Sequence, residues 1–302
     1  MRYKIGFDFP HFDQKNIQHA HSHFAFAGWV TQILFVLMIH FLQNKLPTIH
    51  FKQYKIIVAA NLICAYAMLI SFFISGYSAF SITFSTLSIV ISCFFAYFFF
   101  KDLKKLDANN PSKPWFKAAL WFNIFSSLGT FYLAYIMMSK NFHENTYLAA
   151  IYFYLHFQYN GFFIFACMGL AINEAIRLLP AYKYHKIIFQ LFFAAAIPAY
   201  FLSILWASIP IWLYIIIVIA AFVQVIAWFI FFWDFFRSLS DKTHLGGLVR
   251  YLYLFVCIAF SVKLLLQLGS TIPIISKMAF GFRPIIIAYL HLVLLAVISV
   301  FL

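Results

Sequence analysis

The chain has 302 residues, of which 65% are hydrophobic and only 10% are charged. Ordinary soluble domains carry about 25% charged residues, so this composition excludes a soluble globular domain and predicts a membrane protein. The formal net charge is +13, but the basic residues gather in the connections between apolar stretches. Their distribution therefore indicates membrane topology rather than nucleic-acid binding.

Nine apolar stretches are long enough to cross a bilayer, because a spanning helix needs about 20 residues. In chain order they are 21–43, 55–76, 78–100, 115–138, 148–172, 187–205, 209–235, 248–268 and 284–302. The sequence therefore predicts an all-α, polytopic transmembrane helix bundle over 21–302, preceded by an N-terminal segment, 1–20. The last stretch reaches Leu302 without a polar flank, so we leave open that the sequence is part of a longer protein.

Lysine and arginine residues gather in every second connection between these stretches. Fourteen of the 21 lie in or beside the connections after the first, third, fifth and seventh stretches, against three in the alternate connections. The positive-inside rule then places the first set in the cytoplasm. We expect a multi-pass protein of the bacterial inner membrane whose N-terminal segment is extracytoplasmic.

Four histidines lie in these stretches where polar groups are expensive and usually functional. His21 and His23 stand at the start of the first stretch and point about 200° apart on a helix, so they can serve different neighbours. His156 lies about 12 Å into the fifth stretch and His291 about 10 Å into the ninth. With the predicted orientation, all four lie in the outer half of the bilayer. Since imidazole is a common ligand of haem iron, the sequence predicts haem binding by these four residues.

Two other interpretations stay open. His19 and His23 share one helix face at i, i+4 spacing, so a small-ion site from His19, His23 and His156 is an alternative to haem. A single transmembrane histidine can also serve as a hydrogen-bonding residue between helices, which is the competing interpretation for His291.

Other polar residues of the stretches are candidates for supporting roles. His156 is followed by Gln158, Tyr159 and Asn160, a density of polar side chains too high for lipid exposure. These residues can orient an imidazole or line a water path. Lys263 lies in the eighth stretch, where it either reaches outward to the membrane surface, pairs with a haem propionate or takes part in proton movement.

The motif His21-x-His23-x-x-x-x-Gly28 resembles the corresponding helix of haem–copper oxidase subunit I and its nitric oxide reductase relatives. His156-x-x-x-x-Gly161 is similar to the helix that supplies a histidine to the second metal of that family. By the same resemblance, His291 would be the partner ligand of a low-spin haem. The resemblance covers only these short segments and implies one or two haem b groups, a second metal, and respiratory partners such as a quinol or a cytochrome donor. The sequence has no adjacent His-His pair, which that family uses to complete the second-metal site.

The sequence thus favours a membrane haem b protein with a respiratory electron-transfer or terminal-oxidase-like role. One alternative is a transporter or channel with a histidine-lined polar path, for which broken helices at mid-membrane are typical. Another is a non-catalytic subunit of a respiratory complex.

Overall fold

The structure, a computed structural model, describes residues 13–47, 51–139, 143–178, 184–241 and 246–302, without the side chains of 178 and 236–241. Helices account for all of the regular structure in these residues, and no strand occurs among them. The predicted all-α fold is confirmed. The chain divides into two compact units, Met1–Ala108 and Asn109–Leu302, and each is described by itself.

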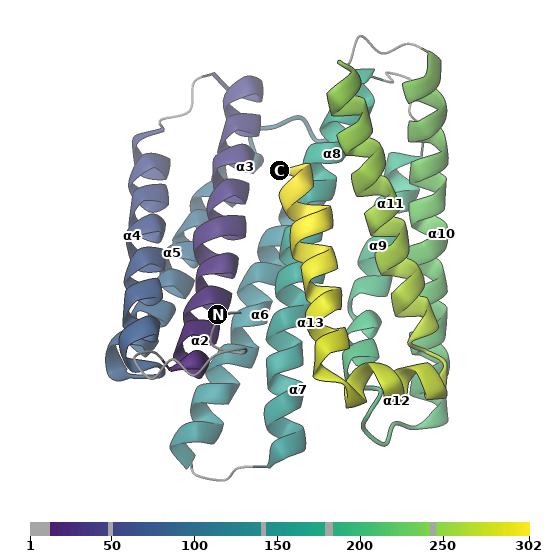
Figure 1. The fold of residues 1–302 in the computed structure, drawn as a ribbon. Helices are drawn as coiled ribbons and strands as arrows, with labels where there is room; N and C mark the ends of the chain where they lie inside the picture. The colour runs from purple at the N-terminus through teal and green to yellow at the C-terminus, as the bar shows by residue number, and fades with distance from the viewer. Residues whose placement is uncertain (1–12, 48–50, 140–142, 179–183, 242–245) are drawn as a thin grey trace. The chain divides into compact units, whose positions relative to one another are not determined.

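Unit 1 contains three long helical runs, of which the first combines two α-helices and a π-helical segment (Figure 1). The elements are α2 (Gln14–His23), η1 (Phe24–Val30, π-helical), α3 (Thr31–Lys45), α4 (Lys52–Ser75) and α5 (Ala79–Leu103). The Asp13 carboxylate caps α2 by accepting the backbone N–H groups of Lys15 and Asn16 at 2.7 and 3.1 Å. Helix α2 therefore begins before the predicted boundary at residue 21, and His21 lies inside a helix rather than at its start.

Helices α4 and α5 of unit 1 are joined by a short turn. Gly76 ends α4 with a φ of 58°, a left-handed conformation that glycine adopts without strain. Ser78 then starts α5 with a capping box, in which its side chain accepts the N–H of Ser81 and the Ser81 hydroxyl accepts the N–H of Ser78. The turn places α4 and α5 side by side, and stacked rings such as Phe35 on Phe95 fill the interior.

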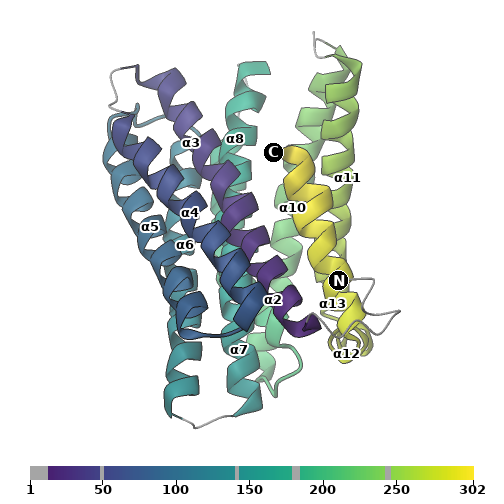
Figure 2. The ribbon, with the colours of Figure 1, turned by 60° about the vertical axis from the view of Figure 1, so that its left-hand side comes forward.

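Unit 2 contains the remaining helices, shown in teal, green and yellow in Figures 1 and 2. They are α6 (Lys113–Ser139), α7 (Glu144–Leu155), η2 (His156–Phe163, π-helical), α8 (Ile164–Leu178), α9 (His185–Ala196), η3 (Pro198–Ile204, 3₁₀), α10 (Ile211–Asp241), α11 (Gly247–Gly269), α12 (Pro273–Gly281), α13 (Arg283–His291) and η4 (Leu292–Ser299, π-helical). Helix α6 packs along α7, η2 and α8, while α10 packs against α9 and α11.

Two apolar runs of unit 2 are broken. The first bends by 43° between α9 and η3, at Pro198, which lacks an N–H and cannot continue the helical ladder. The second bends by 92° between α12 and α13, where Phe282 is extended just before Arg283-Pro284. Helix α12 therefore lies almost perpendicular to α13, at the lower end of α13 in both views (Figures 1 and 2).

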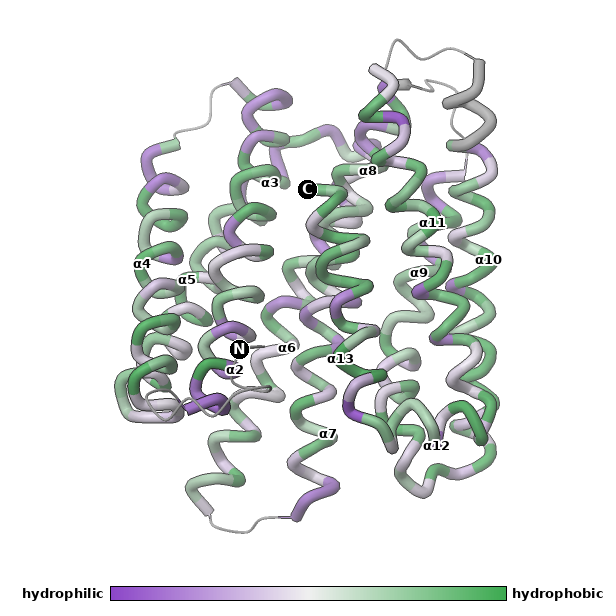
Figure 3. Tube along the Cα trace, in the orientation of Figure 1, coloured by the Kyte–Doolittle hydropathy of each residue, from purple (hydrophilic) through white to green (hydrophobic). Residues whose placement is uncertain are grey.

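Seven helices of the described residues are long and apolar enough to span a membrane, and nine if each bent pair is one span. Apolar residues occupy the middle of the long helices, and hydrophilic residues gather mostly near their ends (Figure 3). Large apolar side chains such as Phe80, Met138 and Ile211 point outward with at least 73% of their surface exposed, as suits contact with lipid. These features agree with the predicted multi-pass membrane protein.

Candidate functional site

Each π-helical segment in the described residues begins at, or directly after, a histidine predicted to bind haem. Segment η1 starts directly after His23, η2 starts at His156, and η4 starts directly after His291. π-Helical turns are rare and occur frequently at functional sites. The backbone thus marks the same three positions that the side-chain chemistry suggests.

The two histidines of the His-x-His motif have different surroundings in unit 1. The His23 ring stacks on Phe72, with 4.1 Å between centroids and 9° between planes, and its Nε2 atom is hydrogen-bonded to Tyr77 Oη at 3.3 Å. His21 is exposed, and its imidazole has no hydrogen bond to any described residue. Only the His21 imidazole is therefore open to a new ligand without losing a contact.

His19 lies one turn before His23 and meets the Tyr77 ring edge-on, with 4.7 Å between centroids. In the part of the chain that the structure describes, no group of three or more His, Cys, Asp or Glu side chains could hold a metal ion. The predicted small-ion site combines His19 and His23 of unit 1 with His156 of unit 2, so it stays a prediction.

A buried amide cluster fixes the π-helical segment of unit 1. The Asn61 Nδ2 group on α4 donates to the Ala27 carbonyl of η1 at 3.0 Å and to Gln32 Oε1 at 2.7 Å. Gln32 Nε2 in turn donates to the Val58 carbonyl at 3.0 Å. Because Asn61 is fully buried, its side chain supplies polar contacts that lipid cannot supply.

Both ring nitrogens of His156 in unit 2 are already engaged. Nε2 donates to the Ala196 carbonyl at 2.9 Å, and Nδ1 accepts from Asn160 Nδ2 at 3.2 Å. The Ala196 carbonyl is available because the Tyr200 N–H donates to Ile197 instead, where α9 breaks before Pro198. His156 is 1% exposed, and in this arrangement it offers no lone pair to a metal.

The polar residues after His156 hold η2 in place. Ser126 Oγ on α6 donates to Gln158 Oε1 at 2.8 Å, which ties η2 to α6. Asn160 orients the His156 ring, and the Tyr159 ring lies 6.5 Å from the Tyr289 ring of α13. Their contacts in unit 2 are therefore those of orienting residues.

His291 has one ring nitrogen engaged within its own helix. Its Nδ1 donates to the Ile287 carbonyl one turn earlier, at 2.7 Å, so the lone pair of the neutral ring is on Nε2. Metal-binding histidines usually donate their other N–H to such an acceptor, which fixes the tautomer and the ring orientation. The residue is exposed, so an incoming group can reach Nε2.

Lys263 on α11 does not reach the surface. Only 3% of the residue is exposed, and it has no hydrogen bond or ion pair with any described residue. Its Nζ atom lies 5.3 Å from the centre of the Phe260 ring. The interpretation in which this side chain extends to the membrane surface is therefore wrong for this structure.

Unit 2 brings His156 together with Asn160, and Gln158 follows on the same segment. His21 and His23 belong to unit 1, so the meeting of the four predicted haem ligands stays a prediction. No family model, curated protein or solved structure matches this chain. The relationship to haem–copper oxidases accordingly remains a resemblance of motifs.

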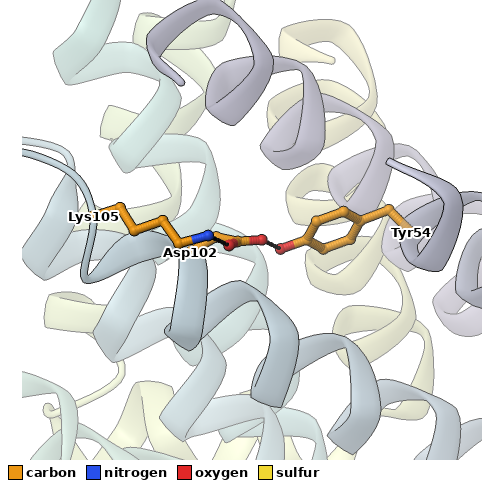
Figure 4. Close-up of polar contacts among 3 residues, drawn as sticks. All are labelled: Tyr54, Asp102 and Lys105. Carbon is orange, nitrogen blue, oxygen red and sulfur yellow. Dashed lines mark hydrogen bonds and ion pairs between the residues drawn. The ribbon is translucent and has the colours of Figure 1, made fainter. Parts of the chain in front are cut away.

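One buried charged cluster of unit 1 was not predicted (Figure 4). Asp102, near the end of α5, accepts the Tyr54 hydroxyl of α4 at 2.8 Å through Oδ2 and pairs with Lys105 Nζ at 2.7 Å through Oδ1. Only 8% of Asp102 is exposed. As the single acidic residue of α4 and α5, it could have been singled out from the sequence.

Replacing Asp102 with alanine should lower the free energy of unfolding by about 1–3 kcal/mol, because the buried Tyr54 hydroxyl loses its acceptor. Unfolding in mixed micelles, followed by tryptophan fluorescence, measures the change. Adding Tyr54→Phe should recover part of the loss, since the unsatisfied hydroxyl is then absent. The matched control is Glu174→Ala, which removes an exposed ion pair with Arg177 and should cost well under 1 kcal/mol. If Asp102→Ala and Glu174→Ala lowered the free energy of unfolding equally, Asp102 would not stabilise the fold as a buried acceptor of the Tyr54 hydroxyl.

Proposed function

We propose that this multi-pass membrane protein binds haem b through its histidines and carries electrons in the bacterial inner membrane. The observation that supports this function most is the coincidence of the π-helical segments with His23, His156 and His291. Each segment is a costly departure from the α-helix, and each adjoins a side chain able to bind iron.

The histidines fit haem to different extents. His291 presents Nε2 with its tautomer fixed by Ile287, and His21 is exposed and not hydrogen-bonded. His23 would have to release Tyr77, and His156 would have to release the Ala196 carbonyl. We therefore propose His291 as an axial ligand within unit 2 and His21 as an axial ligand within unit 1, and we give His156 a positioning role.

A bound haem would supply a one-electron carrier whose potential depends on its axial ligands and on the apolar surroundings. The protein's part is to hold each imidazole in a single tautomer; the Ile287 carbonyl does this for His291. The sequence has no adjacent His-His pair, so we propose electron transfer rather than reduction of oxygen or nitric oxide. A quinol or a cytochrome would be the donor, within a set of respiratory-chain subunits.

The direct test is a pyridine haemochrome assay and a reduced-minus-oxidised optical spectrum of the detergent-purified protein, expressed with adequate haem. We expect the absorption bands of haem b with at least one haem per chain. A protein that is folded and haem-free under these conditions would rule out the proposal.

A transporter is the second candidate, because unit 2 has two broken runs and buried polar residues. Broken helices expose backbone groups that can bind a substrate, but the Ala196 carbonyl at the first break is already bound to His156. This candidate gains support only if the purified protein contains no haem.

The proposed orientation makes a separate prediction. In a cysteine-free background, a reporter cysteine at Lys277 should react with a membrane-impermeant maleimide in intact cells, because Lys277 follows the eighth predicted span. A reporter at Lys104, which follows the third, should react only after permeabilisation. The reverse pattern would contradict an extracytoplasmic N-terminal segment.

A further inference from the structure

Lys263 is a buried cation in unit 2 without a counter-charge. It lies within α11, has no ion pair among the described residues and contacts the face of Phe260. An isolated ammonium in an apolar interior is expensive unless it is paired or neutralised.

The carboxylates of unit 2 are committed or distant. Glu174 pairs with Arg177, and Glu144 is the first residue of α7, about 18 Å along the helical run from His156 at 1.5 Å per residue. Asp234 and Asp241 lie about 15 and 26 Å along α10 from Gln224 by the same rise. The segments 140–142, 179–183 and 242–245 contain no Asp or Glu. None of the described carboxylates of unit 2 is therefore placed to pair with Lys263.

Two buried amides lie at the level of Lys263. Gln267 is one turn further along α11, on the same face. Helix α10 runs antiparallel to α11, and the Trp228 Nε1–H of α10 donates to Ser261 Oγ of α11 at 2.8 Å. Gln224 is one turn before Trp228, so it lies opposite the turn of α11 that follows Ser261. The Oε1 atoms of both glutamines are buried and have no hydrogen-bond partner among the described residues. Rotation of either amide would present its NH₂ group beside the ammonium.

We infer that Lys263 binds a carboxylate inside unit 2, with Gln224 and Gln267 as neighbouring donors. A carboxylate supplies the missing charge and accepts from an ammonium and from amides through two oxygens, as charge-assisted hydrogen bonds. Its source is either a small free carboxylate or a propionate of haem, and only the second source rests on the proposed function.

The test uses the full-length protein in detergent, dialysed into sodium chloride and titrated with sodium formate at constant ionic strength and pH. Tryptophan fluorescence follows the thermal unfolding midpoint. The unfolding midpoint of the haem-free wild type should rise by roughly 5 °C when the formate concentration is one hundred times its dissociation constant. Lys263→Met, which removes the charge but keeps an unbranched side chain, should not respond to formate. In chloride without formate, this variant should be at least as stable as the wild type, because no unpaired charge remains buried.

Two further variants make the result interpretable. Lys277→Met removes an exposed lysine of α12 and should respond like the wild type, and Lys263→Arg should retain the response. A wild type that does not respond, or a Lys263→Met variant that still responds, would overturn the inference.

Repeating the titration on haem-loaded protein separates the two sources of the carboxylate. Loss of the response identifies a haem propionate as the occupant, and an unchanged response identifies a free carboxylate. Failure of the chain to bind haem leaves the haem-free titration valid.

Discussion

Replacing His291 with alanine should remove most of the haem b from the purified protein while leaving the fold intact. Among the described residues, the imidazole is hydrogen-bonded only to Ile287 of the same helix, and the side chain is exposed. Little packing is lost when the ring is removed, so a fall in the haem-to-protein ratio would report ligation. The ratio is measured by the haemochrome assay and normalised to protein by amino-acid analysis.

The matched control for this variant is His40→Ala. His40 is also exposed and also bonded within its own helix, to Asn44 at 3.1 Å, but it lies near the opposite end of its run from His21. We expect it to keep the wild-type haem content. Equal haem contents in His291→Ala and the wild type would remove His291 from the ligand set.

Replacing Gly129 with leucine should prevent α6 from packing on α7 and should strongly destabilise unit 2. Even a Cβ atom at this position would lie 2.8 Å from the Ala150 carbonyl oxygen and 2.9 Å from the Tyr154 nitrogen. These are backbone atoms that cannot rotate away. Small residues permit this close approach of membrane helices.

The smaller change Gly129→Ala should still cost about 1–3 kcal/mol, the usual cost of overpacking. Gly269→Ala is the control, because no atom of the described residues lies within 4 Å of a Cβ placed at Gly269. Unfolding in mixed micelles compares the two variants. A Gly129→Ala protein as stable as Gly269→Ala would show that α6 and α7 do not approach as closely as described.

Much of the fold follows from the apolar pattern, and the exceptions have local causes. Helix α4 covers Lys52–Ser75 where the pattern predicts 55–76, because a run of apolar residues must be helical to satisfy its backbone in lipid. The first helix begins earlier than predicted because Asp13 caps it. Helix α12 was not predicted: its nine residues are too few to span a membrane, and Pro273 and Pro284 start separate helices.

The candidate site was predicted in part. Spacing alone indicated that His21 and His23 point in different directions, and their surroundings do differ. The contact between His156 and Ala196 could not be predicted, since it joins residues forty positions apart and depends on a helix break before Pro198. The π-helical segments have no simple sequence signature either, so their coincidence with the histidines emerged only from the structure.

The most direct test of the central claim is pulsed electron paramagnetic resonance on the oxidised protein, purified from cells grown with ¹⁵N-labelled histidine. Haem ligation by histidine predicts hyperfine coupling between the iron and ¹⁵N nuclei, and the coupling should be lost or reduced in His291→Ala. Haem that is present but shows no coupling to a histidine nitrogen would contradict the proposed role of these residues.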